Sequence, residues 1–152
     1  MQMTDSFMDA ALTQAKLAAE RSEVPVGAVI VFKNEIISRA GNRTLELNDP
    51  SAHAEVLAIR HACEKLGSQR LTNCDLYVTL EPCTMCASLI SFARIRRLYI
   101  AAEDEKGGGV LNGVRFYNHS TCHHVPEIYS GLQESTAAEL LKSFFKSRRH
   151  RS

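Results

Sequence analysis

Four residues in two short segments have the types and spacing of a metal centre with a carboxylate beside it. His53 and Glu55 are two residues apart in the first segment, and Cys83 and Cys86 are three residues apart in the second. Imidazole nitrogens and thiolate sulfurs are preferred ligands of zinc. The cysteine spacing puts both side chains on one side of the first turn of a helix, where the helix dipole stabilises thiolates. We therefore predict a zinc site made by His53, Cys83 and Cys86.

The number of protein ligands separates structural zinc from catalytic zinc, because catalytic sites keep one coordination position open. The candidates for a fourth ligand are Cys63, Cys74, Cys122, His61, His119, His123 and His124. Cys63 lies ten residues after His53, about 15 Å along a helix, and the same argument excludes His61. Cys74 is expected at the opposite end of a strand from Cys83. Three ligands are therefore the better count, and this count predicts a catalytic site.

Glu55 follows the histidine closely enough to exchange protons with groups at such a site. A carboxylate beside a three-ligand zinc can act as a general base and then as a general acid. The alternative is that the negative charge of Glu55 only stabilises the N-terminus of a helix by its interaction with the helix dipole. A C-x-x-C pair alone is also typical of a redox motif or of half a zinc finger. The prediction therefore depends on both segments together.

The elements that must position these residues follow from hydrophobic periodicity and turn signals. Helices are expected at 4–22, at 51–66 with Ser51 as cap and Gly67 as stop, at 83–92 and at 135–149; strands are expected at 26–32, 35–39, 76–80, 97–101 and 125–129. Lys33-Asn34 is the expected turn of a hairpin between the first two strands. This order predicts an α/β fold, a three-layer α/β/α domain with a mixed five-stranded sheet. Leu140, Leu141, Phe144 and Phe145 form an apolar stripe that the last helix is expected to bury.

The composition is that of a single globular domain spanning residues 1–152. Hydrophobic residues make up 45% and charged residues 23% of the 152 residues, which is ordinary for such a domain. We see no internal repeat, secretory signal or apolar run of the roughly 20 residues that a membrane span needs. Five unevenly spaced cysteines suggest no disulfide framework. A cytoplasmic protein without membrane contact is expected.

The charge distribution is uneven along the chain. The first 141 positions hold 13 basic and 17 acidic residues, whereas 142–152 hold no acid. The basic residues of this final stretch are Lys142, Lys146, Arg148, Arg149 and Arg151. Cations at a helix C-terminus suit the helix dipole, but a basic cluster is also a common feature of nucleic-acid binding.

Beyond the metal motif, the sequence closely resembles the bacterial tRNA-specific adenosine deaminases of the cytidine deaminase superfamily. The combination His-x-Glu with Pro-Cys-x-x-Cys is the signature of zinc deaminases. Further blocks that resemble the family are 23–29 (EVPVGAV), 41–43 (GNR), 52–55 (AHAE), 76–83 (LYVTLEPC), Arg94-Ile95, Asp104-x-Lys106-x-Gly108, His124-x-x-Glu127-Ile128 and Phe144-Phe145. The resemblance extends over roughly residues 4–149.

The resemblance implies an activity and assigns roles to residues. It implies hydrolysis of adenosine to inosine at the wobble position of a tRNA anticodon, by a homodimer with one Zn²⁺ per subunit in which each anticodon stem-loop contacts both subunits. Glu55 would be the acid/base catalyst, and the substrate would be bound by Asn42, Ala54, Asp104 and Lys106. The RNA backbone would be contacted by Lys146, Arg148 and Arg149. The dimer interface is expected at the helix 87–92 and the arginines Arg94, Arg96 and Arg97.

One segment departs from the family pattern, and two other functions stay open. Residues 109–121 (GVLNGVRFYNHST) do not match the family, which bears on RNA contacts and substrate preference rather than on zinc. The main alternative is a deaminase of a free nucleobase or nucleoside such as guanine or cytosine. A zinc-stabilised RNA-binding module without catalysis is the other, but it leaves Glu55 unexplained. A second metal at Cys122-His123-His124 is disfavoured, since neighbouring residues of a strand point to opposite faces.

Overall fold

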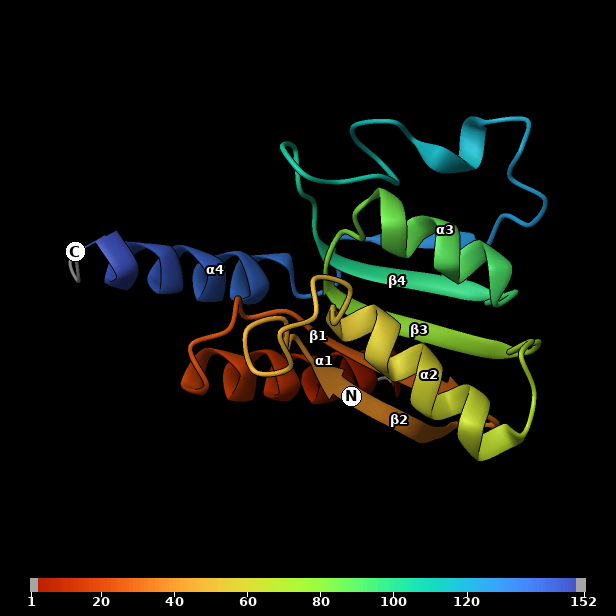
Figure 1. Ribbon diagram of the computed structural model, residues 1–152, viewed down its shortest axis with the longest axis horizontal. Helices are drawn as coiled ribbons and strands as arrows, with labels where there is room; N and C mark the ends of the chain where they lie inside the picture. Colours follow the sequence, from red (N-terminus) through yellow and green to blue (C-terminus); the bar gives the residue numbers. More distant parts are fainter. Residues whose placement is uncertain (1–2, 150–152) are drawn as a thin grey trace.

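The structure is a computed structural model that describes residues 3–149, and its centre is a mixed sheet of five strands (Figure 1). The strands are β1 (Gly27–Phe32), β2 (Glu35–Gly41), β3 (Cys74–Leu80), β4 (Arg97–Ala102) and β5 (Glu127–Ser130), in the order β2-β1-β3-β4-β5. β1 pairs antiparallel with both β2 and β3, whereas β3, β4 and β5 are parallel. The predicted mixed five-stranded sheet is confirmed.

The hairpin between β1 and β2 forms at the predicted turn. Lys33 and Asn34 both have positive φ values, of 51° and 63°. Two successive residues in this left-handed region are typical of the tight turn whose twist matches that of paired strands. The hairpin places β2 at the outer edge of the sheet, and Asn42 follows directly after this strand.

The helices cover both faces of the sheet (Figure 1). They are α1 (Met3–Glu20), α2 (Ala54–Leu66), α3 (Thr84–Phe92) and α4 (Glu134–Arg149), with a short 3₁₀ helix η1 (Phe116–Asn118). α2 and α3 pack on one face over the larger apolar core, and α1 and α4 pack on the other over a smaller one. The predicted three-layer α/β/α arrangement is confirmed. No helix in the described part of the chain is long and apolar enough to cross a membrane.

Two predicted helix starts were placed too early. α2 begins at Ala54 with His53 as its N-cap, not at Ser51. The backbone N–H and hydroxyl of Ser51 both bond to the Asp49 carboxylate, at 2.8 and 2.7 Å, so a local turn holds this serine. α3 likewise begins at Thr84 with Cys83 as its N-cap. Only Cys86 therefore lies inside the first helical turn.

The last strand and the last helix also differ from expectation. β5 begins at Glu127, two residues later than predicted. α4 contacts β4, α1 and β3 and then extends past the ends of the strands (Figure 1). Its stripe is therefore only partly covered: Ala137 is buried, Leu140, Leu141 and Phe144 are half-buried, and Phe145 is 46% exposed. The expectation that the helix buries the whole stripe is wrong for Phe145.

Candidate metal centre and active site

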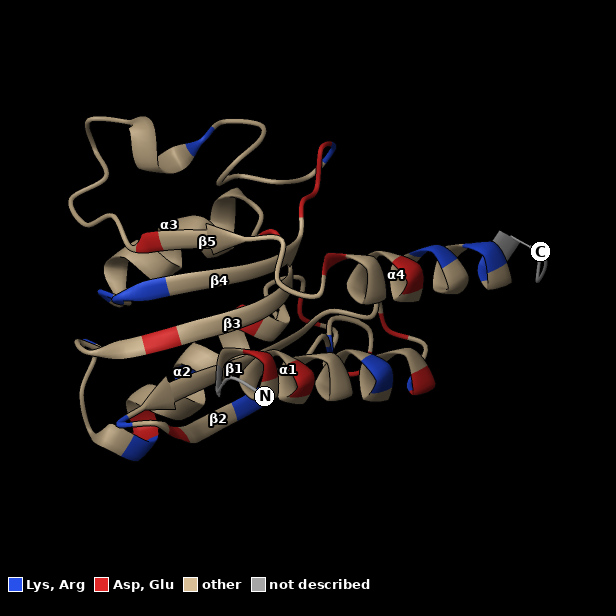
Figure 2. Cartoon of the chain, turned by 180° about the vertical axis from the view of Figure 1, so that it is seen from behind, with Lys and Arg blue, Asp and Glu red and all other residues tan. Residues whose placement is uncertain are grey.

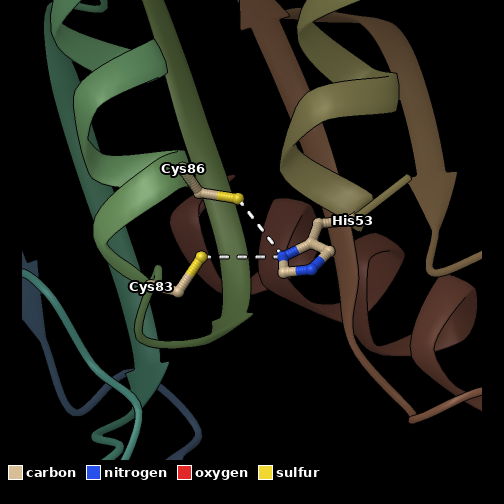
Figure 3. Close-up of side chains that lie close together, drawn as sticks. All are labelled: His53, Cys83 and Cys86. Atoms are coloured by element: carbon tan, nitrogen blue, oxygen red, sulfur yellow. Dashed lines mark hydrogen bonds between the residues drawn. The ribbon is translucent and has the colours of Figure 1, made fainter. Parts of the chain in front are cut away.

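The predicted ligands meet at the starts of two neighbouring helices. His53 precedes α2, and Cys83 and Cys86 lie at the start of α3, which follows the C-terminal end of β3. Their side chains point toward one another (Figure 3). The Nδ1 atom of His53 lies 3.7 Å from the sulfur of Cys83 and 3.5 Å from that of Cys86. Among the described residues, these three make the one group of histidine, cysteine and acidic side chains that could hold a metal ion.

The distances between these atoms fit zinc. Tetrahedral bonds of about 2.3 Å to sulfur and about 2.0 Å to nitrogen place a nitrogen and a sulfur ligand about 3.5 Å apart. The two nitrogen–sulfur distances of 3.5 and 3.7 Å are close to this value. Cys86 is buried, whereas His53 and Cys83 are half-buried. The site therefore combines a soft donor set with access from one side.

The two sulfurs influence each other's protonation. A hydrogen bond from Cys86 is the main reason that the pKa of Cys83 falls to about 4. The same hydrogen bond, together with burial, raises the pKa of Cys86. A thiolate at Cys83 thus disfavours ionisation of the Cys86 thiol, in part through its negative charge. A bound dication would offset this repulsion and favour both thiolates, as zinc ligation requires.

Glu55 lies in the first turn of α2 with a side chain that is 3% exposed. Burial raises the pKa of this carboxyl to about 7, although the positive charge of His53 counteracts part of the effect. A carboxyl with a pKa near neutrality can both accept and release a proton at physiological pH. Its position beside the three ligands is the geometry expected for proton transfer.

A cavity of about 260 Å³ opens onto the three predicted metal ligands, which we call the metal group. Its lining includes His53, Glu55, Cys83, Asn42 and Asp104, so the structure brings these five predicted site residues together. Further residues in its wall are Val24, Val26, Thr44, Leu80 and Glu81.

The other two predicted substrate residues are placed differently. Ala54 is buried, and its backbone N–H donates to the Oδ1 atom of Asn42 at 2.8 Å. This bond fixes the orientation of the Asn42 amide. Lys106 is exposed and is absent from the cavity wall; its backbone N–H bonds to the Asp104 carboxylate at 3.2 Å.

Two buried glutamates without a role predicted from the sequence lie in or next to this cavity: Glu81 is part of its wall, and Glu23 precedes the lining residue Val24. Glu23 is 1% exposed and accepts hydrogen bonds from the backbone of Leu45 and Glu46, in the loop after Asn42. Glu81 is 2% exposed and accepts five hydrogen bonds from residues 104–112. Burial raises the pKa of Glu81, but these bonds outweigh it and hold the pKa below its ordinary value. Its position next to Pro82-Cys83 was the available signal.

The basic residues gather along the outer half of α4 (Figure 2). Lys146 and Arg148 are exposed. The guanidinium of Arg148 lies 4.7 Å from the centre of the Phe144 ring and also donates to the carbonyl of Ser22. Arg149 is the last residue of α4, and its side chain lies outside the described part of the structure, as does the whole of Arg151.

The segment Cys122-His123-His124 bonds to the chain around it rather than to a shared centre. A ring nitrogen of His124 lies 2.7 Å from the carbonyl oxygen of Ile95. The sulfur of Cys122 contacts the hydroxyl of Ser91 at 3.5 Å and the carbonyl of His124 at 3.2 Å. These contacts hold the chain between η1 and β5 against α3.

Comparison with known proteins gives a consistent result. Residues 1–102, which include all three ligands and Glu55, match the cytidine and deoxycytidylate deaminase zinc-binding region. The tRNA-specific adenosine deaminase of Agrobacterium fabrum is 62% identical over 94% of each chain.

Two solved structures extend this comparison. One from a study of A-to-I editing by tRNA:A34 deaminases at the wobble position is also 62% identical, covers 90% of this chain and 99% of its own, and superposes with a TM-score of 0.89. Guanine deaminase from Bacillus subtilis is 33% identical, covers 95% of this chain and 92% of its own, and superposes with a TM-score of 0.65. The chain belongs to the tRNA-specific adenosine deaminase family and carries the zinc-binding region of the cytidine and deoxycytidylate deaminases.

Proposed function

We propose that this protein hydrolyses adenosine to inosine at the wobble position of a tRNA anticodon, in the cytoplasm. The observation that carries the proposal is a three-ligand metal group beside a buried carboxyl, in a cavity that can take a single flipped base. The family of its relatives supports the choice of adenosine in tRNA. A target base must leave its stack to reach such a site, and an anticodon loop allows this readily.

His53, Cys83 and Cys86 hold one zinc ion in this proposal, and Glu55 moves the protons. When bound, zinc lowers the pKa of water and supplies a nucleophile at neutral pH. Overall, water adds at the carbon that bears the amino group, and ammonia leaves. Glu55 accepts the proton that the water loses, delivers it to the adjacent ring nitrogen, and then helps to protonate the leaving amino group. Its pKa of about 7 suits both directions of transfer.

Asn42 and Asp104 recognise the base from the cavity wall. Because Oδ1 of Asn42 already accepts the N–H of Ala54, the NH₂ group of this amide is the part left to donate to an acceptor on the purine. Asp104 also lines the cavity, on the loop that follows β4. Lys106 is exposed beside it and suits a phosphate rather than the base.

The anticodon stem is bound through α4. This helix starts just after β5, which is parallel to β3 and β4 and so ends at the same edge of the sheet as the metal group. From that edge it carries its basic residues outward, with the exposed Lys146 and Arg148 near its end (Figure 2). Both can contact phosphates.

The protein acts as a homodimer, with the second copy seated on a groove between α2 and α3. The groove has a volume of about 750 Å³, and the residues in its lining include Ile59, Cys63, Leu89 and Phe92. Phe92 is 74% exposed, a large apolar surface that a partner would cover. Arg96 and Arg97 contribute little, because both pair with Asp75 of the same chain.

Sedimentation analysis should give a dimer for the wild type and a monomer for Phe92→Asp, with Phe145→Asp as the control. A monomeric wild type contradicts this part of the proposal.

The decisive experiment compares substrates. Purified protein is given an anticodon stem-loop with adenosine at the wobble position and, separately, free adenine, adenosine, guanine and cytosine. We expect inosine in the stem-loop alone. Release of ammonia from a free base, without inosine in the stem-loop, would support the alternative of a nucleobase deaminase with the same metal site.

A further inference from the structure

The carboxylate of Glu81 is saturated with hydrogen bonds. One oxygen accepts from the backbone N–H of Asp104 at 3.0 Å and from the side-chain amide of Asn112 at 2.7 Å. The other accepts from the backbone N–H groups of Val110, Leu111 and Asn112 at 3.1, 2.9 and 3.0 Å. A carboxylate offers about four lone-pair positions. Glu81 therefore has no acceptor capacity left for a metal ion or a substrate.

These bonds attach both ends of one loop. Asp104 comes soon after β4, and Val110 to Asn112 form the other end, where the segment unlike the family begins. Between them, Gly108 packs so closely that a Cβ atom would lie 2.2 Å from the Glu81 carboxylate. A Cβ atom on Gly109 would lie 2.6 Å from the backbone nitrogen of Thr84. The loop 104–112 thus rests directly on the segment that carries Cys83.

The loop also supplies part of the substrate cavity. Asp104 lines the cavity together with Glu55 and Cys83. The position of Asp104 relative to these two residues depends on its backbone bond to Glu81 and on the bond from Gly109 to the carbonyl of Pro82, at 2.8 Å. A single buried carboxylate therefore connects the metal-binding segment to the part of the cavity wall that Asp104 forms.

We propose that Glu81 is a positioning residue. It fixes Asp104, which forms part of the cavity wall, at the distance from Glu55 and Cys83 that adenosine requires. Glu81 belongs to the cavity wall, but donors from the loop 104–112 occupy both of its carboxylate oxygens, so it acts through Asp104 and not by binding metal or substrate itself. The proposal rests on the function proposed above and deepens it, because it assigns part of substrate recognition to a residue outside the reacting groups.

Glu81→Gln is a sharp test, because an amide keeps one acceptor oxygen and replaces the other by a donor. The oxygen can stay with the three backbone donors of Val110 to Asn112. The new NH₂ group then faces Asn112, whose amide can rotate to accept from it. The N–H of Asp104 is the group left without its acceptor, so this substitution releases mainly the Asp104 end of the loop.

We expect Glu81→Gln to retain one zinc per subunit and to raise the KM for the stem-loop about tenfold, with kcat within about threefold of wild type. Hydrogen exchange should show loss of protection at Asp104. In an Asp104→Ala background the same substitution should change KM less than twofold, because coupled residues are not additive. Asp75→Asn is the matched control: it alters another buried carboxylate, at the far end of β3, and should leave KM unchanged.

A loss of zinc, a fall in kcat at constant KM, or an additive effect in the Asp104→Ala background would each overturn the proposal. If Glu81→Gln does not fold, Glu81→Asp tests the same contact, because it keeps the charge but withdraws the carboxylate from the loop by one methylene, and it should raise KM in the same way; an unchanged KM would overturn the proposal. A wild type that is inactive on the stem-loop would refute the proposed function instead. Unchanged protection at Asp104 in Glu81→Gln would refute the anchoring by itself.

Discussion

The metal cavity and the helix α4 are both assigned to the same substrate, yet they are held in the protein in different ways. The ligands and Glu55 lie at the starts of α2 and α3, over the larger of the two apolar cores. Around them, Glu23 and Glu81 fix the neighbouring loops by backbone hydrogen bonds. α4 packs on the sheet through its first turns, and Lys142, Lys146 and Arg148 farther along it are exposed, with one bond from Arg148 to the carbonyl of Ser22. Reaction chemistry needs positions fixed to a fraction of an ångström, whereas phosphate contacts tolerate adjustment because charge acts at longer range.

The largest expected effect is the loss of the metal. Cys86→Ala removes a buried ligand, and a zinc site with two remaining protein ligands binds weakly. We expect zinc content to fall close to zero and deamination to become undetectable, while circular dichroism still shows the folded α/β structure, because the core does not depend on the ion. Metal analysis after dialysis measures this.

Cys122→Ala is the matched control for that variant. Cys122 also contacts α3, through Ser91, but it is not among the three grouped ligands. It should keep one zinc per subunit and near-normal activity. Equal zinc loss in the two cysteine variants would contradict the assignment of ligands.

The next effect in size is the loss of the proton carrier. Glu55→Gln keeps the shape of the side chain but cannot accept a proton, and a general acid–base catalyst contributes about 10²- to 10⁴-fold to the rate. We expect kcat to fall by this factor with zinc content unchanged. Glu35→Gln, an exposed glutamate on the hairpin, serves as the control. Turnover near the wild-type rate in Glu55→Gln would rule out the assigned mechanism.

Deleting residues 146–152 should have a moderate effect, confined to binding. The deletion removes the three predicted phosphate contacts, Lys146, Arg148 and Arg149, together with Arg151 and the end of α4. Each phosphate contact contributes to the slope of log affinity against log salt concentration by about 0.7 on a single strand and about 0.9 on a duplex, so the loss of three contacts lowers this slope by about 2 to 3. We expect this fall in the slope and a rise of about tenfold in KM, with kcat and zinc content unchanged. Lys33→Ala, at the exposed hairpin turn, is the control. An unchanged slope would move the RNA contacts to another surface.

The contrast between the two regions also explains what the sequence could predict. The grouping of His53, Cys83 and Cys86 was predictable because zinc chemistry demands certain residue types at certain spacings, and the structure brings the three together. Glu55 was expected beside them and lines the same cavity; its role in proton transfer stays a prediction. The order of layers was predictable because the apolar periods are regular. The start of α2 was not, because Ser51 can cap a helix or bond to Asp49, and only the folded loop decides between them.

Two other features depend on contacts between residues far apart in the chain. Glu81 bonds to residues 23 to 31 positions away. Its place beside Pro82-Cys83 marks it as close to the site, but it does not indicate which distant loop the carboxylate will hold. The exposure of Phe145 depends on how far α4 reaches beyond the sheet, which periodicity does not encode. The apolar stripe predicted a buried face of α4, but it does not indicate where along the helix the contacts with the sheet and α1 end.

The smallest expected effect separates Phe144 from Phe145. Phe144 is half-buried and supports the guanidinium of Arg148, which in turn donates to the carbonyl of Ser22 at the end of α1. Phe145 is 46% exposed. We expect Phe145→Ala to change the free energy of unfolding by less than about 0.5 kcal/mol, as is usual for surface substitutions. Phe144→Ala should cost about 1–2 kcal/mol, because it removes partly buried apolar area and the cation–π contact. Urea denaturation of the two variants measures the difference, and stem-loop affinity tests whether Phe145 contacts RNA. A larger loss of stability for Phe145→Ala would mean that α4 buries its other side in solution, and the basic residues would then have to be reassigned to a different face.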